Sequence, residues 1–252
     1  MGGGRSRVSW SMTHPLLDEL SQVKRLVALT GAGMSTESGL PDFRSQEGLW
    51  RQFSPEELAS VEALRHNPLQ FYEFYRFRLQ LLDNVAPNAG HKALAELERQ
   101  GRLQCVVTQN VDGLHTAAGS RNVVEIHGSL RRAHCHECGR PHSPDVLKRP
   151  VTDLSQLPRC PCGGLIRPGV VLFGEMLPED ALRQAIRAVE DCEALLVIGS
   201  SLQVYPAASL PQLALDRGAR LWIINLTPTP YDHAAEIVVR RKAAEVLSRL
   251  IA

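Results

Sequence analysis

Four of the six cysteines stand close together in the sequence, in two pairs that are separated by 21 residues. The pairs are Cys135-x2-Cys138 and Cys160-x-Cys162. Cysteine pairs at such spacing are typical of zinc sites, and four thiolates fill a tetrahedral coordination sphere. We therefore expect one structural Zn²⁺ rather than a catalytic one. Three nearby histidines are alternative ligands: His134, His136 and His142. The remaining cysteines, Cys105 and Cys192, have apolar neighbours and are expected in the core.

Polar residues directly follow five short apolar runs, which are typical of buried strands. The runs are Leu26–Thr30, Leu103–Thr108, Val123–Ile126, Ala194–Ile198 and Leu221–Ile224. The residues after them are Gly31-Ala32-Gly33, Gln109-Asn110, His127-Gly128, Gly199-Ser200-Ser201 and Asn225. His127 is a candidate general base, because a neutral imidazole near pH 7 can accept a hydroxyl proton. A structural histidine is the alternative interpretation, as turn formation is for Asn110 and Asp112.

The turn at Gly31-Ala32-Gly33 could approach a phosphate, since a glycine turn between strand and helix brings backbone N–H groups close to an anion. The spacing matches the dinucleotide fingerprint only in part, because Thr36 stands where the third glycine belongs. A plain tight turn is the alternative. Asp42 and Arg44 follow closely and favour a nucleotide, whose ribose hydroxyls and phosphates need both an acidic and a basic partner.

The alternation of strand-like runs with helical patterns predicts an α/β fold. Helical patterns lie at His91–Gln100 and Pro178–Asp191, between the apolar runs. Such alternation indicates a Rossmann-like, mainly parallel sheet with helices on both faces. Ligands of such sheets bind beyond the carboxyl ends of the strands, which is where the polar residues described above are expected.

Two stretches break this alternation and predict a second, smaller domain. Residues 43–84 look helical, whereas residues 130–168 carry the cysteine pairs and lack a core-like run. We expect the two insertions to form a small zinc-binding and helical domain over the sheet. The Rossmann-like domain then comprises residues 12–42, 85–129 and 169–252, after a flexible N-terminal tail at residues 1–11.

Motifs along nearly the whole chain resemble those of the sirtuins, which are NAD-dependent protein-lysine deacylases. The first comprises Gly31-Ala32-Gly33, Ser35, Ser38-Gly39 and Pro41-Asp42-Phe43-Arg44. The others, in the order of the family, are Thr108–Asp112 with Leu114-His115, then His127-Gly128, Pro168–Glu175 and Gly199–Ser201. Several independent motifs in the same order make a chance resemblance very improbable.

The resemblance implies NAD as co-substrate, acyl-lysine proteins as partners, and nicotinamide and O-acyl-ADP-ribose as products. His127 would be the base that assists the ribose hydroxyls. Contacts to NAD are implied at Gly31, Ala32, Gly33, Ser35, Asp42, Phe43, Arg44, Trp50, Gln109, Asn110, Asp112, Gly199, Ser200, Ser201, Asn225, Leu226, Thr227 and Ala243. Substrate contacts are implied at Val171, Leu172, Phe173 and Gly174, an extended segment that would pair with a peptide strand. A buried strand is the alternative interpretation of that segment.

The helical stretch around Tyr75 suggests which acyl group is removed. Positions 71, 74, 75 and 78 share one helix face, so Arg78 lies on an apolar stripe. A buried arginine needs an anionic partner, although its long side chain could instead reach solvent. Tyr75-x-x-Arg78 is similar to the pair with which one sirtuin branch binds malonyl and succinyl groups. We therefore expect a deacylase that accepts acidic acyl groups and also acetyl groups.

Composition excludes several other classes. The 252 residues carry a formal net charge of +1, which argues against bulk attraction to nucleic acid or membrane. Apolar runs stay far below the roughly 20 residues of a membrane span, and the start lacks a secretion signal. We expect a cytoplasmic protein with no membrane partner. Three alternatives remain: a deacetylase without preference for acidic acyl groups, a protein ADP-ribosyltransferase, and a zinc-containing nucleic-acid module, since residues 131–167 hold seven basic and three acidic residues.

Overall fold

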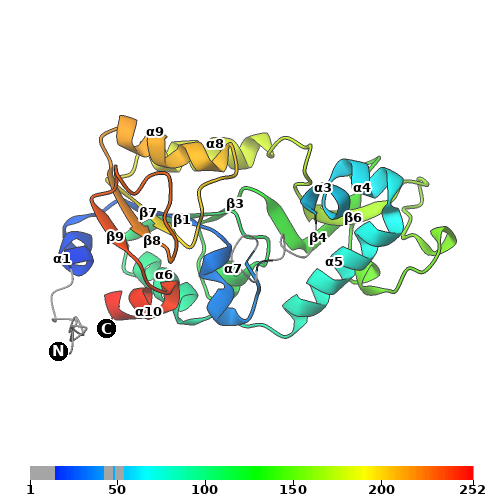
Figure 1. Ribbon diagram of the computed structural model, residues 1–252, viewed down its shortest axis with the longest axis horizontal. Helices are drawn as coiled ribbons and strands as arrows, with labels where there is room; N and C mark the ends of the chain where they lie inside the picture. Colours follow the sequence, from blue (N-terminus) through cyan, green and yellow to red (C-terminus); the bar gives the residue numbers. More distant parts are fainter. Residues whose placement is uncertain (1–14, 43–47, 49–53, 252) are drawn as a thin grey trace, which may run out of the picture.

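The computed structural model describes residues 15–42, 48 and 54–251. The expected tail at residues 1–11 lies outside them, as do the predicted NAD contacts Phe43, Arg44 and Trp50. In the described part, a six-stranded sheet with flanking helices lies at one end of the molecule, and a smaller unit of helices and short strands lies at the other (Figure 1). None of the helices in these ranges is long and apolar enough to cross a membrane.

The six-stranded sheet is parallel throughout, in the order β3-β2-β1-β7-β8-β9. Its strands are β1 (Leu26–Thr30), β2 (Leu103–Thr108), β3 (Val123–Glu125), β7 (Ala194–Ile198), β8 (Arg220–Ile224) and β9 (Ile237–Val239). Counted within the sheet, this is the order 3-2-1-4-5-6 of Rossmann folds. The predicted fold class is therefore confirmed. Strand β9 was not predicted, because its three residues are too few to form a recognisable run.

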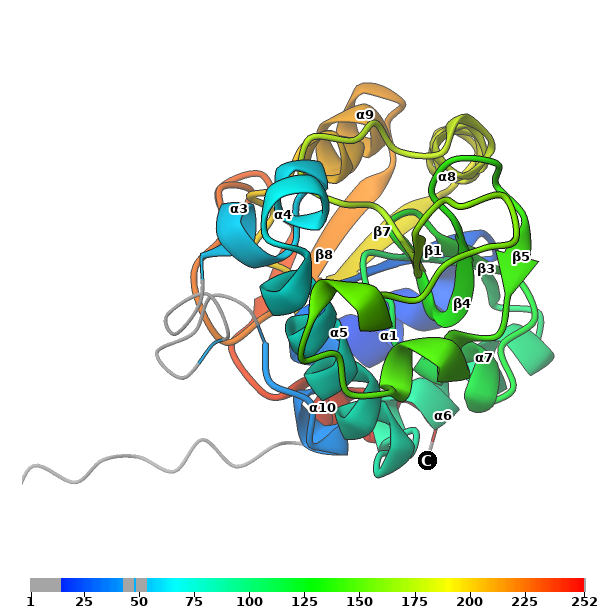
Figure 2. The same ribbon diagram turned by 90° about the vertical axis from the view of Figure 1, so that its right-hand side faces the viewer.

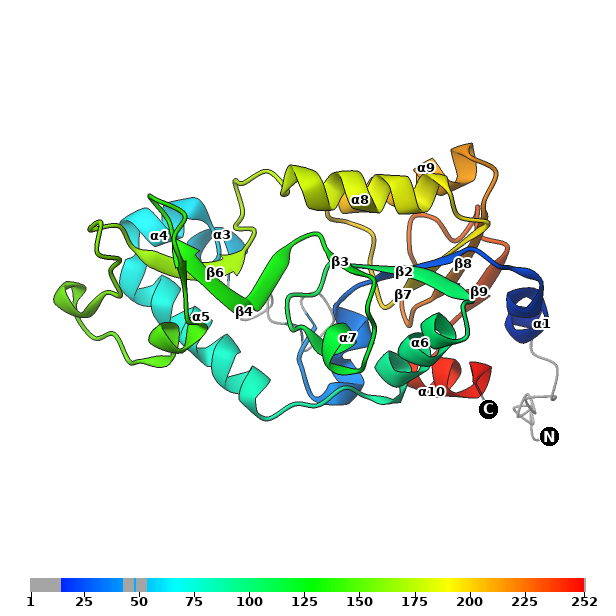
Figure 3. The same cartoon turned by 180° about the vertical axis from the view of Figure 1, so that it is seen from behind.

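Helices cover both faces of this sheet (Figures 1 and 3). One face carries α1 (Pro15–Gln22), α6 (Ala89–Arg99) and α10 (Ala243–Leu247), and the other carries α8 (Glu179–Glu190) and α9 (Leu210–Asp216). Strand β1 shows why both faces must be covered. Leu26 and Ala28 pack toward α6, whereas Val27 and Leu29 pack toward α8. All five residues of β1 are buried, as expected for a central parallel strand.

A second hydrophobic core lies in the smaller unit, where helices pack on a three-stranded antiparallel sheet of order β5-β4-β6 (Figure 2). Its elements are α3 (Pro55–Leu58), α4 (Val61–His66), α5 (Pro68–Asp83), β4 (Gly128–Cys135), β5 (Pro141–His142) and β6 (Ile166–Val170). The helices agree with the sequence prediction. The sheet does not, because residues 130–168 were expected to lack a core-like run, yet Leu130 and Ile166 are buried against α5. Exposed Arg131 and Arg132 interrupt the apolar pattern of β4.

Short helices complete the described part of the chain. One is the α-helix α7 (Leu114–Ala117), and the others are the 3-10 helices η1 (Ala32–Met34), η2 (Thr36–Ser38), η3 (Pro144–Lys148), η4 (Leu154–Gln156), η5 (Ala207–Ser209) and η6 (Ser248–Leu250). The helices η1 and η2 directly follow β1. The glycine turn is therefore continued by two tight turns, which hold Ser35 between them at the carboxyl edge of the sheet.

Candidate active site and metal site

A cleft of about 890 Å³ lies at the carboxyl ends of the parallel strands and extends to helix α5 of the smaller unit. It is lined by every predicted NAD and substrate contact that lies in the described part of the chain. These are Gly31, Ala32, Gly33, Ser35, Asp42, Tyr75, Arg78, Gln109, Asn110, Asp112, His127, Val171, Leu172, Phe173, Gly174, Gly199, Ser200, Ser201, Asn225, Leu226, Thr227 and Ala243. The structure thus brings together residues that are more than 200 positions apart in the sequence.

The glycine turn after β1 packs directly against the turn after β7. The N–H of Gly33 donates to the carbonyl oxygen of Gly199 at 2.9 Å. A Cβ at Gly33 would lie 2.8 Å from the Cα of Gly199, which leaves no room for a side chain. Gly199 itself has a φ of 59°, a region that favours glycine. Glycine at these positions therefore lets the two turns pack backbone to backbone, and both turns also line the cleft, where backbone N–H groups could bind a phosphate.

Ser35, Asn110 and Asp112 form a buried hydrogen-bonded cluster at the tips of β1 and β2. The Ser35 hydroxyl donates to Oδ2 of Asp112 at 2.7 Å and accepts from Nδ2 of Asn110 at 3.1 Å. Oδ1 of Asp112 accepts the N–H of Leu114 at 2.9 Å. Burial of all three side chains next to the cleft fixes their orientation, because rotation would leave polar atoms without partners.

His127 is half-buried in the cleft, and its Nδ1 lies 3.0 Å from the carbonyl oxygen of Gln109. A carbonyl oxygen can only accept, so Nδ1 carries the proton and Nε2 of the neutral ring is a free acceptor. Burial lowers the pKa of His127, while the hydrogen bond to Gln109 raises it. The ring is therefore neutral at pH 7, in the protonation state of a general base.

The backbone conformation and packing at position 128 require a glycine directly after His127. The φ of Gly128 is 76°, and a Cβ there would lie 2.2 Å from the carbonyl oxygen of Gly169. Close approach of β4 to β6 at this point continues into a hydrogen bond from Val171 N–H to the carbonyl oxygen of His127, at 2.9 Å. The candidate base and the candidate peptide-binding segment are thus joined backbone to backbone.

The segment Val171–Gly174 follows β6, ends in a turn at Gly174 with a φ of 91°, and forms one wall of the cleft. Phe173 already pairs with a neighbouring stretch, because its N–H donates to Ala59 at 2.9 Å and its carbonyl oxygen accepts from Val61 at 3.1 Å. Glu175 fixes the end of the segment. Its carboxylate binds the buried guanidinium of Arg167 at 2.5 and 3.0 Å and accepts the N–H of Leu172 at 2.8 Å.

Tyr75 and Arg78 lie at the end of the cleft formed by α5. Tyr75 is only 1% exposed, and burial raises its pKa to about 12. Arg78 is half-buried, with its guanidinium 5.8 Å from the ring centre of Phe74 and 5.9 Å from that of Tyr75. Burial lowers the pKa of Arg78, whereas the hydrogen bond with Tyr75 and the charge of Asp112 raise it. The predicted apolar stripe, on which Arg78 lies between Tyr75 and Leu82, is therefore present.

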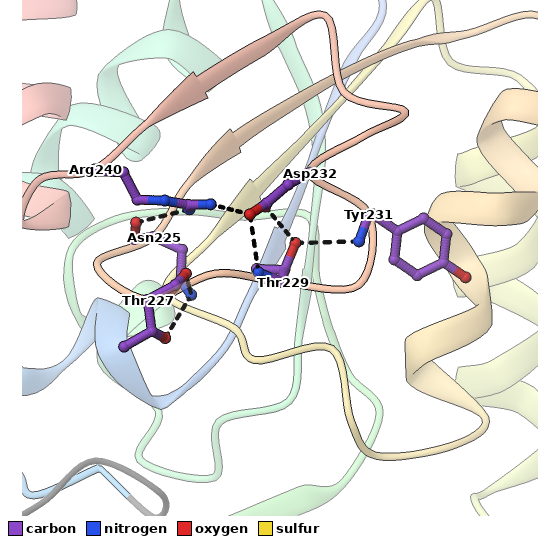
Figure 4. Close-up of polar contacts among 6 residues, drawn as sticks. All are labelled: Asn225, Thr227, Thr229, Tyr231, Asp232 and Arg240. Atoms are coloured by element: carbon purple, nitrogen blue, oxygen red, sulfur yellow. Dashed lines mark hydrogen bonds and ion pairs between the residues drawn. The ribbon is translucent and has the colours of Figure 1, made fainter.

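The opposite end of the cleft is formed by the loop after β8. Figure 4 shows Asn225 at the start of this loop, with its side chain turned toward Thr227. Nδ2 of Asn225 donates to the carbonyl oxygen of Thr227 at 2.8 Å and to its hydroxyl at 3.3 Å. The loop is held from behind by Arg240 and Asp232, which form an ion pair. Arg241 and Lys242, not predicted from the sequence, also line this end of the cleft.

The four predicted metal ligands come together in space. Their sulfur atoms all lie within 4.8 Å of one another. Sγ of Cys162 lies 3.4 Å from those of Cys135 and Cys138, and Sγ of Cys138 lies 3.8 Å from that of Cys160. Tetrahedral Zn²⁺ with bonds of about 2.3 Å places its sulfur ligands about 3.8 Å apart. The cluster fits this ion, so the single-residue spacer between Cys160 and Cys162 is no obstacle.

Two fully buried histidines beneath the cleft were not assigned a role from the sequence. Nε2 of His115 lies 2.9 Å from the hydroxyl of Thr30, and the rings of His91 and His115 lie 4.8 Å apart. Nε2 of His91 lies 3.5 Å from the hydroxyl of Ser35. His115 belongs to the Leu114-His115 motif, which was a usable signal. His91 showed only as the start of a helical pattern.

The fold and the cleft define a class: Rossmann-like α/β proteins that carry a four-cysteine module beside the sheet. Residues 31–206 match the model of the Sir2 family. An NAD-dependent protein deacetylase of Geobacillus kaustophilus is 51% identical over 233 residues, which cover 92% of this chain and 94% of that protein. An NAD-dependent protein deacylase of Archaeoglobus fulgidus is 47% identical over 241 residues, or 95% and 97% of the two chains. The chain belongs to the Sir2 family, and the resemblance to the sirtuins is confirmed.

Solved structures agree with this assignment. A complex of a Sir2 homologue with NAD has a TM-score of 0.87 at 45% identity and covers 96% of this chain and 93% of that one. A Sir2 complex with a p53 peptide and NAD⁺ has a TM-score of 0.85 at 38% identity and covers 94% and 96%. Those relatives bind NAD, and one of them binds a peptide together with it.

Proposed function

We propose that this protein is an NAD-dependent deacylase that removes acyl groups from lysine side chains of proteins. The observation that carries the proposal is His127, whose ring is held as an acceptor inside the cleft by the Gln109 carbonyl. Relatives with nearly the same length are named as NAD-dependent deacetylases and deacylases. The described lining of the cleft offers the backbone, amide and carboxylate groups that binding of NAD needs.

NAD would supply a ribose carbon that carries nicotinamide as its leaving group. The acyl-lysine, NAD and one water then yield lysine, nicotinamide and O-acyl-ADP-ribose. We assign the phosphates to the turns at Gly31–Gly33 and Gly199–Ser201, because both turns line the cleft and lie at the carboxyl ends of β1 and β7. Asn110 and Asp112 are assigned to the nicotinamide and ribose end, and Asn225, Leu226, Thr227 and Ala243 to the adenosine end.

His127 would act as the general base. Its Nε2 accepts a proton from a ribose hydroxyl, while the Nδ1–H continues to donate to the Gln109 carbonyl oxygen and keeps the ring in place. The lowered pKa keeps this nitrogen unprotonated at neutral pH. The substrate peptide would lie along Val171–Gly174. Since the backbone of Phe173 already pairs with Ala59 and Val61, and the Val171 N–H with His127, we place the peptide's backbone contacts at the Val171 carbonyl oxygen and at Gly174.

The cysteine cluster would hold one Zn²⁺ with a structural role. Its four thiolates leave no open coordination position for substrate. None of the four cysteines is among the described residues that line the cleft. The ion would instead join the two ends of the segment between β4 and β6. Only part of this segment packs in the hydrophobic core of the smaller unit.

We further propose that the acyl pocket accepts acidic groups, succinyl and malonyl, as well as acetyl. Arg78 supports this assignment because it places a positive charge in an otherwise apolar end of the cleft, next to the Tyr75 hydroxyl. A planar guanidinium suits a carboxylate, which it can bind through two hydrogen bonds. The rival is a deacetylase without this preference, in which Arg78 serves only Tyr75 and Asp112.

A panel of acetyl-, malonyl- and succinyl-lysine peptides tests these proposals. Each peptide is incubated with purified protein and NAD, and nicotinamide and O-acyl-ADP-ribose are quantified by mass spectrometry. We expect nicotinamide release that requires the acyl group, and a succinyl rate at least equal to the acetyl rate. Failure of every acyl peptide would refute deacylation. The alternative is ADP-ribosyl transfer. It would be established if nicotinamide release did not depend on the acyl group and the label of ADP-ribose-labelled NAD were transferred to protein.

A further inference from the structure

The loop between β8 and β9 carries Asn225, Leu226 and Thr227 into the cleft and then runs through Thr229 and Asp232 to β9, which Arg240 directly follows (Figure 4). We propose that Arg240 and Asp232 are positioning residues for NAD: they hold this loop so that Asn225 offers its amide oxygen to the adenosine ribose. The inference rests on the proposed function. Among the described residues, the lining of the cleft includes neither Arg240 nor Asp232, so the pair would act through the loop.

The main chain of Asn225 is fixed on both sides. Its N–H donates to the carbonyl oxygen of Val239, the last residue of β9, at 3.1 Å. Its own carbonyl oxygen accepts from Nη1 of Arg240 at 3.1 Å. The peptide groups on either side of Asn225 are therefore tied to the end of the neighbouring strand. Their rotation, and with it the direction of the Asn225 side chain, is set by residues 239 and 240.

Arg240 also reaches the far side of the loop. Its Nη2 forms the ion pair with Oδ2 of Asp232. The same carboxylate accepts the N–H of Thr229 at 3.1 Å and the hydroxyl of Thr229 at 2.7 Å. One rigid guanidinium thus ties the start of the loop, at Asn225, to its return, at Asp232. A lysine has no such planar fork and can replace only one of these contacts.

The side chain of Asn225 shows what this arrangement leaves for a ligand. An amide has two N–H donors and one oxygen acceptor. The donating nitrogen is turned onto Thr227, at 2.8 Å and 3.3 Å. The oxygen is what remains for the cleft, and it matches the O–H donor of a ribose hydroxyl. A loop that is not held by Arg240 would let this amide turn, and the match would be lost.

The same two strands provide a matched control at their opposite end. Arg220, the first residue of β8, forms an ion pair with Glu236, which precedes β9, at 2.7 Å. The side-chain exposures are 29% and 49% for this pair, and 35% and 26% for Arg240 and Asp232. Glu236→Gln and Asp232→Asn therefore each weaken an ion pair of the same β8–β9 unit, one far from the cleft, where Arg220 keeps Glu19 as a second partner at 2.6 Å, and one next to the loop that lines the cleft.

Calorimetric titration with ADP-ribose, which contains the adenosine end of NAD, tests the proposal without depending on turnover. We expect Asp232→Asn to weaken ADP-ribose binding about tenfold, because the competent loop conformation becomes a minor fraction of the population. KM for NAD should rise by a similar factor, with a much smaller change in kcat at saturating NAD. Arg240→Lys should show an intermediate loss, and Glu236→Gln should bind like the wild type. Thermal denaturation would show that all three variants are folded.

The outcomes separate this inference from the proposed function. If the wild type binds neither ADP-ribose nor NAD, the proposed function itself fails. If the wild type binds both and Asp232→Asn binds equally well, the positioning role is refuted while the function stands. An equal loss of affinity in Asp232→Asn and Glu236→Gln would also overturn the inference, because the effect would then reflect general weakening of β8 and β9.

Discussion

Replacing Arg78 by methionine should separate deacylation of acidic groups from deacetylation. Methionine keeps an unbranched, apolar stem in the stripe formed by Phe74 and Tyr75, but it removes the charge. A succinyl or malonyl carboxylate would then lie in a pocket with no cationic partner from α5. An acetyl group has no carboxylate, so its pocket loses little.

The magnitude follows from the surroundings of Arg78. Its guanidinium is half-buried between two aromatic rings, and burial lowers its pKa, so it is partly stripped of water. A hydrogen bond to a charged group contributes about 1.5–3 kcal/mol. That range corresponds to a loss of about 10- to 150-fold in kcat/KM for succinyl-lysine. For acetyl-lysine we expect a change below about threefold.

The assay compares succinyl- and acetyl-peptides of one sequence in the wild type, Arg78→Met and a control, Arg76→Met. Arg76 lies on the same helix and binds Glu73 through Nε at 2.9 Å, so its loss tests the stability of α5 without touching the cleft. Equal losses on both substrates in Arg78→Met would refute the reasoning. Arg78 would then interact with the charge of Asp112, which raises the pKa of Arg78, and not with the acyl group.

Three further results are expected. His127→Ala should keep its circular dichroism spectrum but lose at least about a hundredfold in kcat, since a general base contributes 10²–10⁴-fold; unchanged turnover would exclude His127 as the base. Cys138→Ser, or chelation of the native protein, should lower the thermal midpoint and release one Zn²⁺ per chain by metal analysis, and a metal-free native protein would contradict the closed site. Burial lowers the pKa of His91 to about 4 and of His115 to about 3, so below pH 6.5 the unfolded chain binds these protons first. The free energy of unfolding should therefore fall on acidification from pH 6.5 toward pH 4, by about 1.4 kcal/mol per histidine and pH unit, and a urea titration of His115→Phe should show a shallower fall.

The parallel sheet could be predicted because its central strands are buried on both faces. Such strands are short apolar runs, as at Leu26–Thr30 and Ala194–Ile198, and each is directly followed by a glycine. The same geometry predicted much of the cleft, since the carboxyl ends of parallel strands meet at one edge. Strand β9 could not be predicted, because three residues show no period. The hydrogen bond from Arg240 to the Asn225 carbonyl oxygen, which depends on β9, could not be predicted either.

The antiparallel sheet could not be predicted in the same way. Strand β4 has one side on the core of the smaller unit and the other toward solvent, but Arg131 and Arg132 are both exposed where alternation requires one buried residue. The register of β4 against β6 shifts between Ser129 and Ala133, which explains the broken pattern. A register shift depends on the partner strand, so the local sequence cannot reveal it.

The buried histidines show a second limit. Their neutral state depends on residues brought in from three separate elements: β1 gives Thr30, α6 gives His91 and α7 gives His115. The hydroxyl of Thr30 donates to that of Thr108, which in turn accepts the N–H of Asn110 at 3.0 Å. This spatial chain and the contact of His91 with Ser35 connect His115 to the cleft, and no spacing in the sequence encodes them.

The cleft divides the reaction between two cores, and this division sets what substitutions can change. The proposed base and the proposed NAD contacts lie at strand tips of the parallel sheet, whereas Tyr75 and Arg78 lie on α5, which packs in the core of the smaller unit. Hydrogen bonds join the two parts, among them those from the Val171 N–H to the His127 carbonyl oxygen and from the Leu130 N–H to the Val111 carbonyl oxygen. Changes at Arg78 should therefore alter the choice of acyl group at nearly constant NAD affinity. Changes at Asp232 should alter the NAD affinity at a nearly constant choice of acyl group.

A double variant, Arg78→Met with Asp232→Asn, should show additive losses in log(kcat/KM) for succinyl-lysine, because the sites share no partner among the described contacts. Strong non-additivity would mean that the acyl pocket and the adenosine loop move together.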